Sequence, residues 1–215
     1  MPTRTVVALD LDGTLTRGDT LLPFLCRAFG RGRTYHALLA GSLLIVRSMA
    51  GWTSRHDAKE AVLRRLLRGQ SVADLETAAE AFAAEVVSRG MRPDMTRRIR
   101  AHRRAGHELV IVSASPEIYV RPLARRLQID TVLATRLEVD GSGHLTGRLE
   151  GANCRGPEKV VRLRDWLGPH GTLAWAYGNS HGDRELLAQA EHGVHVGHGR
   201  RLRPLGADVA VDSPP

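Results

Sequence analysis

Apolar residues recur at helical spacing through much of the first half of the chain. Between Thr20 and Ser88, positions three and four residues apart form four apolar runs, and glycines that can end helices interrupt them. The pattern predicts four successive helices without a strand between them, over residues 20–29, 35–49, 54–67 and 72–88. We interpret this all-helical block as an insertion.

The rest of the chain alternates between short apolar runs and helical segments. Strands are predicted at 6–9, 108–113, 131–134, 172–177 and 194–196, helices at 94–105, 117–127, 158–166 and 184–190, and a hairpin over 136–149. Such alternation is typical of a parallel sheet with helices on both faces. The predicted fold is therefore α/β, with a doubly wound, mainly parallel sheet. We place its core in residues 1–16 and 91–215 and a helical subdomain in residues 17–90.

The most apolar run of the chain lies in the helical block, at residues 37–46. A helix needs about 20 apolar residues to span a bilayer, so this run is too short. We interpret it as a buried helix of the subdomain. Arginines at positions 31, 33 and 47 flank the run and leave a contact with a membrane surface open.

The charge of the chain favours anionic partners. Its 215 residues have a formal charge of +8, and Lys59 and Lys159 are the only lysines among 31 basic residues. This preference for arginine indicates a general bias in residue usage, with many arginines on solvated helix faces. No groove-entering motif accompanies the charge, and only 4% of the residues are aromatic, so we expect no nucleic-acid partner.

The two cysteines point to a reducing compartment. Cys26 and Cys154 lie far apart and have no metal-binding spacing. The first residues enter a predicted strand and show no signal-peptide pattern. We expect a cytoplasmic protein.

Two carboxylates follow the first predicted strand. Asp10 and Asp12 end the apolar run Val6–Leu9, and Gly13 and Thr14 come next. In open α/β sheets, ligands bind beyond the carboxyl ends of the strands. Where the strand gives way to a turn, both carboxylates can approach one cation. The alternative is an ordinary Asp-Gly turn without chemistry.

Polar residues also follow two later strands. Ser113 and Ala114 end the predicted strand 108–113, where a hydroxyl and a free backbone N–H suit a phosphate oxygen. Because Pro116 and Glu117 follow, Ser115 is the predicted N-cap of the next helix, which leaves Ser113 available for a ligand.

Asn179 and Asp183 follow the strand 172–177 and offer two further oxygen ligands. Together with Asp10 and Asp12 they suit Mg²⁺.

Lys159 lies in the first turn of a predicted helix, in a chain that otherwise uses arginine. A lysine is a compact point charge suited to one phosphate oxygen. The alternative is a surface lysine, although a cation is slightly unfavourable at a helix N-terminus.

These segments resemble the four ordered motifs of the haloacid dehalogenase superfamily. The motifs are Asp10-x-Asp12-Gly-Thr, the strand-terminal Ser113, Lys159 and Gly-Asn-Ser-x-x-Asp183. The helical block is similar to that superfamily's helical cap of the first type. The run Asn-Cys-x-Gly-x-x-Lys and the overall length resemble its phosphoserine-phosphatase-like branch. The resemblance covers nearly the whole chain and implies a Rossmann-like core.

The resemblance implies a phosphatase that hydrolyses a phosphomonoester. Asp10 would attack phosphorus and become an aspartyl-phosphate. Asp12 would act as general acid and then as general base. Ser113 and the Ala114 N–H would bind a phosphoryl oxygen, and Lys159 would neutralise charge on the nucleophile and the phosphate.

The resemblance also implies a magnesium cofactor, held by Asp10, Asp12, Asn179 and Asp183. The family usually has aspartate at the position of Asn179, so this site has one negative charge less and weaker metal binding is expected. This departure motivates an alternative, a catalytically weak binding or regulatory protein that keeps the fold.

The substrate stays open at this level. Asp19 falls where related amino-acid phosphatases have a glutamate that reads the substrate amine, but Gly18-Asp19-Thr20 is also an ordinary helix N-cap. The apolar run 37–46 is consistent with a lipid or isoprenoid phosphate. We therefore expect a small phosphorylated substrate, either a metabolite or such a lipid.

Overall fold

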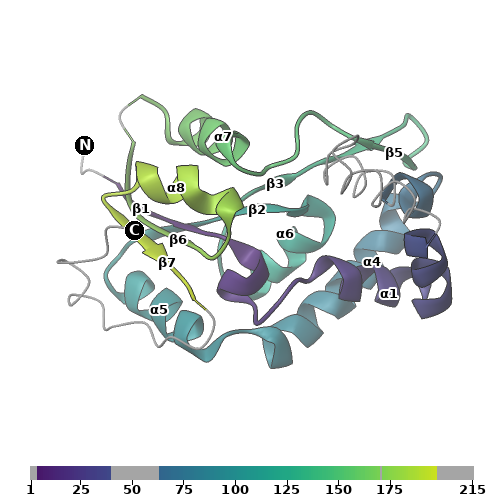
Figure 1. Ribbon diagram of the computed structural model, residues 1–215, viewed down its shortest axis with the longest axis horizontal. Coiled ribbons are helices and arrows are strands. Elements are labelled where there is room, and N and C mark those ends of the chain that lie inside the picture. The colour runs from purple at the N-terminus through teal and green to yellow at the C-terminus, as the bar shows by residue number, and fades with distance from the viewer. Residues whose placement is uncertain (1–3, 40–62, 170, 198–215) are drawn as a thin grey trace.

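A five-stranded parallel sheet forms the centre of the molecule (Figure 1). The computed structural model describes residues 4–39, 63–169 and 171–197. The strand order is β3-β2-β1-β6-β7, and each neighbouring pair is parallel. The strands are β1 (Thr5–Leu9), β2 (Glu108–Pro116), β3 (Thr131–Thr135), β6 (Thr172–Gly178) and β7 (His192–His195). The predicted α/β fold is confirmed.

The continuous apolar run of β1 explains its place in the middle of the sheet. Val6, Val7, Ala8 and Leu9 are all fully buried, as expected for a parallel strand covered on both faces. Val7 and Leu9 belong to one apolar cluster, whereas Val6 and Ala8 belong to another. Successive side chains of β1 therefore supply the two cores on opposite faces of the sheet.

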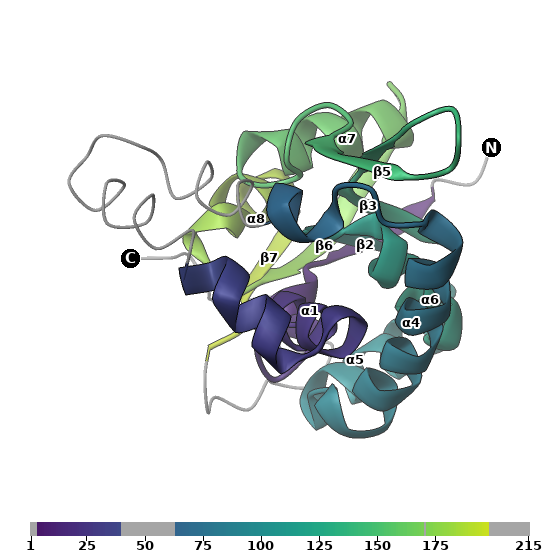
Figure 2. The same ribbon diagram turned by 90° about the vertical axis from the view of Figure 1, so that its right-hand side faces the viewer.

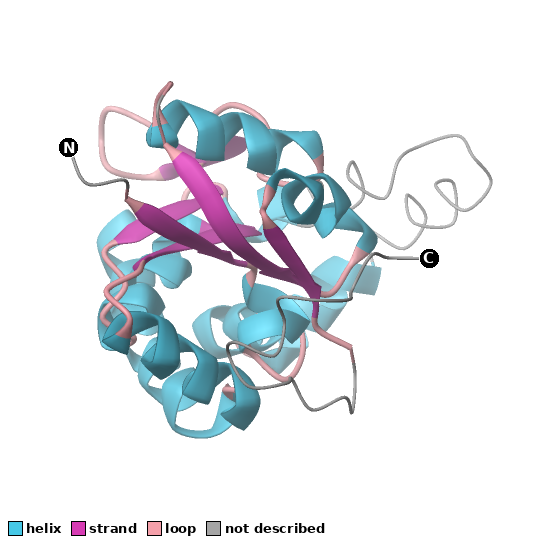
Figure 3. Ribbon diagram, turned by 90° about the vertical axis from the view of Figure 1, so that its left-hand side faces the viewer, coloured by secondary structure: helices cyan, strands magenta, loops and turns pink. Residues whose placement is uncertain are grey.

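Helices cover both faces, as Figure 3 shows. The cluster on one face includes Leu163 of α7 and Leu186 of α8. The cluster on the other face includes Ile99 of α5 and Leu123 of α6. These helices are α5 (Pro93–Arg104), α6 (Glu117–Arg126), α7 (Pro157–Leu167) and α8 (Arg184–Gln189).

A helical region lies beyond the carboxyl ends of the strands (Figures 1 and 2). Its described parts are α1 (Leu21–Phe29), helical residues 31–39 and 63–67, α4 (Val72–Glu85) and the single turn η2 (Val86–Gly90). The predicted helices over 35–49 and 54–67, with the apolar run 37–46, lie largely outside the described residues. No described helix is both long and apolar enough to span a membrane.

Aromatic side chains join the helical region to the sheet layer. Phe24 of α1 and Phe82 of α4 both pack against Tyr119 of α6, with ring centroids 4.6 and 5.7 Å away. The chain leaves and re-enters the sheet layer at one place, where Arg17 N–H donates to the Gly90 carbonyl and Arg92 N–H to the Leu15 carbonyl.

The predicted hairpin is present as β4 (Leu137–Val139) and β5 (Leu145–Leu149). Its second strand contacts the helical region, because Leu145 exchanges backbone hydrogen bonds with Gly69 and Gln70. The hairpin therefore lies against the helical region.

His102 of α5 is a buried ionisable group in the core. Its Nε2 lies 2.8 Å from the Tyr177 hydroxyl and its Nδ1 lies 2.9 Å from Nδ1 of His107. Burial, together with the charges of His107 and Arg98, lowers the pKa of His102 to about 3. The folded protein therefore holds this imidazole neutral.

We predict that His102 makes stability fall in mild acid. In the unfolded chain, His102 has its ordinary pKa of 6.5 and is protonated below that pH. In the folded chain it becomes protonated only near pH 3. Stability from this group is therefore complete above pH 6.5, and the free energy of unfolding decreases by up to about 1.4 kcal/mol per pH unit below it. Urea denaturation followed by circular dichroism between pH 7 and 4.5 measures the slope. It should be shallower in His102→Gln and unchanged in His36→Gln, which alters an exposed histidine. An equal slope in both variants would contradict the prediction.

Candidate active site

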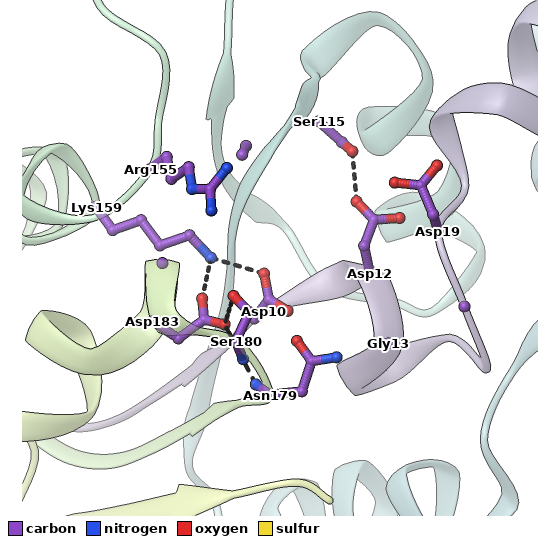
Figure 4. Close-up of a pocket in the computed structure, with 13 residues that line it drawn as sticks. Asp10, Asp12, Gly13, Asp19, Ser115, Arg155, Lys159, Asn179, Ser180 and Asp183 are labelled. Atoms are coloured by element: carbon purple, nitrogen blue, oxygen red, sulfur yellow. Dashed lines mark hydrogen bonds and ion pairs between the residues drawn. The ribbon is translucent and has the colours of Figure 1, made fainter. Parts of the chain in front are cut away.

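The carboxyl ends of β1, β2 and β6 meet at a polar cavity of about 360 Å³ (Figure 4). Six of the seven residues predicted for the site line it, namely Asp10, Asp12, Ala114, Lys159, Asn179 and Asp183. Segments that are far apart in the sequence therefore converge here, as the rule for strand ends predicts.

The first two carboxylates are placed by the tight turn η1 (Leu11–Leu15) after β1. Gly13 adopts a φ of +77°, which favours glycine. A Cβ on Gly13 would also lie 2.0 Å from Nδ2 of Asn179. Gly13 therefore allows the turn after β1 to approach the loop after β6.

Lys159 lies between two carboxylates. Its Nζ is 2.6 Å from Asp10 Oδ1 and 2.6 Å from Asp183 Oδ1, and all three residues are buried. Burial lowers the pKa of Lys159, but the two carboxylates outweigh it and leave the pKa above its ordinary value. The alternative of a surface lysine is therefore wrong.

Asp10 is a buried carboxylate with both oxygens engaged. Lys159 donates to Oδ1, and the Thr14 hydroxyl donates to Oδ2 at 2.7 Å. Burial raises the pKa of Asp10 to about 6, with Lys159 opposing the shift and Asp183 adding to it. The carboxylate thus keeps a fixed orientation at the base of the cavity.

Three donors hold the Asp12 side chain. Thr20 donates to Oδ1 from its N–H at 2.7 Å and from its hydroxyl at 2.5 Å, and the Ser115 hydroxyl donates to Oδ2 at 2.5 Å. Burial nevertheless raises the pKa of Asp12 above its ordinary value. Because Thr20 directly precedes α1, the start of the helical region is tied to Asp12.

The end of β2 differs from the prediction. The strand continues to Pro116, which is itself the N-cap of α6, so the predicted cap at Ser115 is wrong. Ser113 is fully buried and does not line the cavity, and its hydroxyl accepts from the Ser115 N–H at 3.1 Å. Ser115 lines the cavity instead. No sequence pattern identifies Ser115, because its place at the cavity depends on the extension of β2 beyond Ser113.

The loop after β6 is closed by Asp183. Its Oδ2 accepts from the Asn179 N–H, the Ser180 N–H and the Ser180 hydroxyl, at 3.2, 2.9 and 2.7 Å. Burial raises the pKa of Asp183, but Lys159 and these hydrogen bonds outweigh it and lower the pKa overall. Figure 4 shows the amide oxygen of Asn179 on the side of Asp10 and its nitrogen toward Gly13.

Two further charged residues line the cavity that were not among the predicted site residues. Asp19 accepts backbone hydrogen bonds from Leu21 and Leu22 at the start of α1, as the N-cap alternative predicts, and also borders the cavity. Arg155 borders it from the loop that precedes α7. Composition gave no reason to single out this arginine among so many.

The donor chemistry of the cavity is mixed. Within the described parts of the chain, no three His, Cys, Asp or Glu side chains form a ready metal cluster. A cation at the cavity would therefore need carbonyl, amide or water oxygens beside the carboxylates.

A family model for haloacid dehalogenase-like hydrolases matches residues 7–188. The chain belongs to this family. The phosphoserine-phosphatase-like branch is supported by Phosphoserine phosphatase SerB2 of Mycobacterium tuberculosis, which is 27% identical over 99% of this chain and 48% of that protein. Protein CicA of Caulobacter vibrioides is 39% identical, over 91% of this chain and 87% of that protein.

Solved structures share the fold of this chain. A Bordetella pertussis Tohama I protein of unknown function has a TM-score of 0.72 and 30% identity, covering 86% of each chain. A phospho-aspartyl intermediate analogue of phosphoserine phosphatase has a TM-score of 0.54 and 20% identity, covering 87% of this chain and 84% of that one. At this identity the second likeness shows the fold alone.

We predict that removing the buried ammonium group of Lys159 strongly destabilises the fold. Lys159→Met leaves the Asp10 and Asp183 carboxylates buried without their counter-charge, and we expect a loss of about 3–5 kcal/mol in the free energy of unfolding. Urea denaturation at pH 7 without divalent metal measures it. The matched control is Arg27→Met, which breaks an exposed 3.4 Å pair with Glu85 and should cost below about 1 kcal/mol. Similar losses in both variants would show that the buried pairs do not stabilise the fold.

Proposed function

We propose that this hydrolase is a magnesium-dependent phosphatase that cleaves a phosphomonoester through an aspartyl-phosphate on Asp10. The observation that carries the proposal is the contact of Lys159 with both Asp10 and Asp183 at 2.6 Å, at the base of a polar cavity that Asp12 also lines. This arrangement combines a nucleophilic carboxylate, a cation for the phosphate and a second carboxylate for proton transfer. Membership of a hydrolase family supports it.

In the proposed reaction, Asp10 attacks phosphorus and forms a new P–O bond while the ester P–O bond breaks. Lys159 and Thr14 orient the two oxygens of the attacking carboxylate. Asp12 gives its proton to the leaving alkoxide, and its raised pKa favours the protonated form that this step requires. Water then attacks phosphorus and gives a proton to Asp12, while the P–O bond to Asp10 breaks. This regenerates the Asp10 carboxylate and releases inorganic phosphate.

The phosphoryl oxygens have several donors at hand. Lys159 and the N–H groups of Ala114 and of the turn after Asp10 are proposed to bind them. Ser113 is fully buried and lies outside the lining of the cavity, and its oxygen accepts from the Ser115 N–H, so its contact with a phosphoryl oxygen stays a prediction. Ser115 itself orients the Asp12 carboxylate and is a positioning residue in this proposal.

The oxygen donors beside Asp10 fit magnesium. We propose that the Asp10 carboxylate, the Asp12 carbonyl and the Asn179 amide oxygen hold the ion, with water and the substrate completing the shell. Asp183 already accepts from Lys159 and Ser180, so it would support the ion indirectly, by fixing Lys159 and the Asn179 loop. A bound ion offsets the repulsion between carboxylate and phosphate.

The cavity favours a small, polar substrate. Apart from Ala114, the described residues that line it carry polar or charged side chains or are glycines. A phosphorylated metabolite suits such a lining better than a lipid or isoprenoid phosphate. We propose residues 17–90 as the cap that selects the leaving group, since Thr20 links this region directly to Asp12.

We predict that Asp10→Asn abolishes turnover. The amide is a poor nucleophile and removes the charge that pairs with Lys159, so we expect hydrolysis of p-nitrophenyl phosphate at saturating Mg²⁺ to fall about 10³-fold or more. Omitting Mg²⁺ should lower wild-type turnover as well. The control Asp130→Asn alters an exposed carboxylate away from the cavity and should retain activity.

Unchanged turnover in Asp10→Asn would exclude Asp10 as the nucleophile. The alternative of a catalytically weak binding or regulatory protein predicts something different for the wild type. It would then show neither turnover nor formation of the beryllofluoride mimic of the aspartyl-phosphate at saturating Mg²⁺.

We predict that Asn179→Asp increases magnesium affinity. The substitution restores the negative charge found at this position in most of the family and faces the oxygen donors beside Asp10. The Mg²⁺ concentration for half-maximal turnover should fall about tenfold. Gln189→Glu, the same change of amide to carboxylate at an exposed position, should leave it unchanged. An identical Mg²⁺ requirement in Asn179→Asp and wild type would place the ion away from Asn179.

A further inference from the structure

Arg155 is held at the cavity by its backbone. The loop that carries it is fixed to the loop after β6, because the Gly156 N–H donates to the Gly182 carbonyl at 3.0 Å. The Arg155 N–H donates to the Asn153 carbonyl at 2.7 Å. Gly156 has a φ of +57°, which favours glycine, so the turn after Arg155 is specified locally. The position of Arg155 is thus tied to that of the loop that carries Asp183.

The side chain of Arg155 also has a defined seat. A Cβ on Gly182 would lie 3.0 Å from both Cγ and Nε of Arg155, so the side chain lies directly over this glycine. Figure 4 shows its guanidinium directed into the cavity, on the side of Lys159 and opposite Asp19. Among the described residues, the Arg155 guanidinium has no hydrogen-bond or ion-pair partner.

The two cations that line the cavity differ in their partners. Lys159 is already engaged by Asp10 and Asp183 in the buried base of the cavity. Arg155 is exposed and keeps all its donors for a ligand. A guanidinium presents a planar fork that matches a carboxylate or phosphate in a bidentate manner. The carboxylate of Asp19 lines the opposite wall and repels an anion there, so a second anionic group is directed toward Arg155.

We propose that Arg155 binds a second anionic group on the leaving-group side of the substrate. The substrate class is then a phosphomonoester that carries a carboxylate or a second phosphate near the ester. This inference rests on the proposed phosphatase function and deepens it, because Lys159 serves the transferring phosphoryl group while Arg155 selects the leaving group.

Three probes with the same three-carbon chain separate the sources of the anion. Propyl phosphate has no second anion, 3-phosphooxypropanoate has a carboxylate and propane-1,3-diol bisphosphate has a second phosphate. Binding is measured by calorimetry in the presence of Mg²⁺. The Asp10→Asn protein is used because this substitution prevents turnover. At least one doubly anionic probe should bind about tenfold more tightly than propyl phosphate, and the tighter of the two identifies the preferred anion.

Substitutions at Arg155 test whether this preference comes from its guanidinium. In the Asp10→Asn background, Arg155→Gln should remove the preference and leave the affinity for propyl phosphate within about twofold. Arg155→Lys should retain part of it, because the charge stays but the fork is lost. Gly182→Ala keeps the charge and displaces the side chain, so the preference should also decrease. The control Arg184→Gln removes an exposed charge one residue beyond Asp183, outside the cavity, and should keep the preference.

Turnover of the same probes separates this inference from the proposed function. With Asp10 intact, Arg155→Gln should raise KM about tenfold for the preferred doubly anionic probe and leave kcat for propyl phosphate unchanged. An equal loss on all three probes, or no loss on any, would overturn the inference while the phosphatase function stands. Absence of wild-type turnover combined with binding that depends on Arg155 would overturn the function and leave the anion site.

Discussion

The contact between one buried ammonium and two buried carboxylates constrains the rest of this site. Asp10 directly follows the central strand β1, Asp183 closes the loop after β6, and Lys159 reaches both from the first turn of α7. A buried charge is tolerated only when it is paired and hydrogen-bonded, so none of the three can keep its place without the others. Correct placement of α7 and of the loop after β6 is therefore coupled to the end of β1.

Glycines allow these charged segments to approach one another. The missing side chain of Gly13 makes room for Asn179, and that of Gly182 makes room for Arg155. At both positions a larger residue would occupy space that a polar side chain of the cavity now fills. The helical region is also connected to the site, because Asp12, in the turn after β1, accepts from Thr20 directly before α1. The position of Asp12 after β1 thus fixes the start of the helical region, which is the region proposed to select the substrate.

Much of the fold and the convergence of Asp10, Lys159 and Asp183 follow from local patterns. Apolar periodicity identifies the strands and helices, and parallel strands bring their carboxyl ends to one edge. Ser115 could not be placed because the extension of β2 to Pro116 depends on its pairing with β3 rather than on the preference of serine for helix caps. No sequence pattern distinguishes Arg155 in a chain rich in arginine, since its proposed role depends on its position at the cavity in the folded protein.

The charges of the cavity form a consistent set under the proposed function. Asparagine at position 179 removes one negative charge from the proposed metal site, and Arg155 adds a positive charge to the wall. Both residues make the electrostatic potential of the cavity more positive. This favours binding of an anion and disfavours binding of a cation without substrate. A substrate with two anionic groups would then bring negative charge of its own, and its phosphoryl oxygens would complete the magnesium shell. Under the proposed function, metal binding would be coupled to substrate binding, because each would supply part of the charge that the other needs.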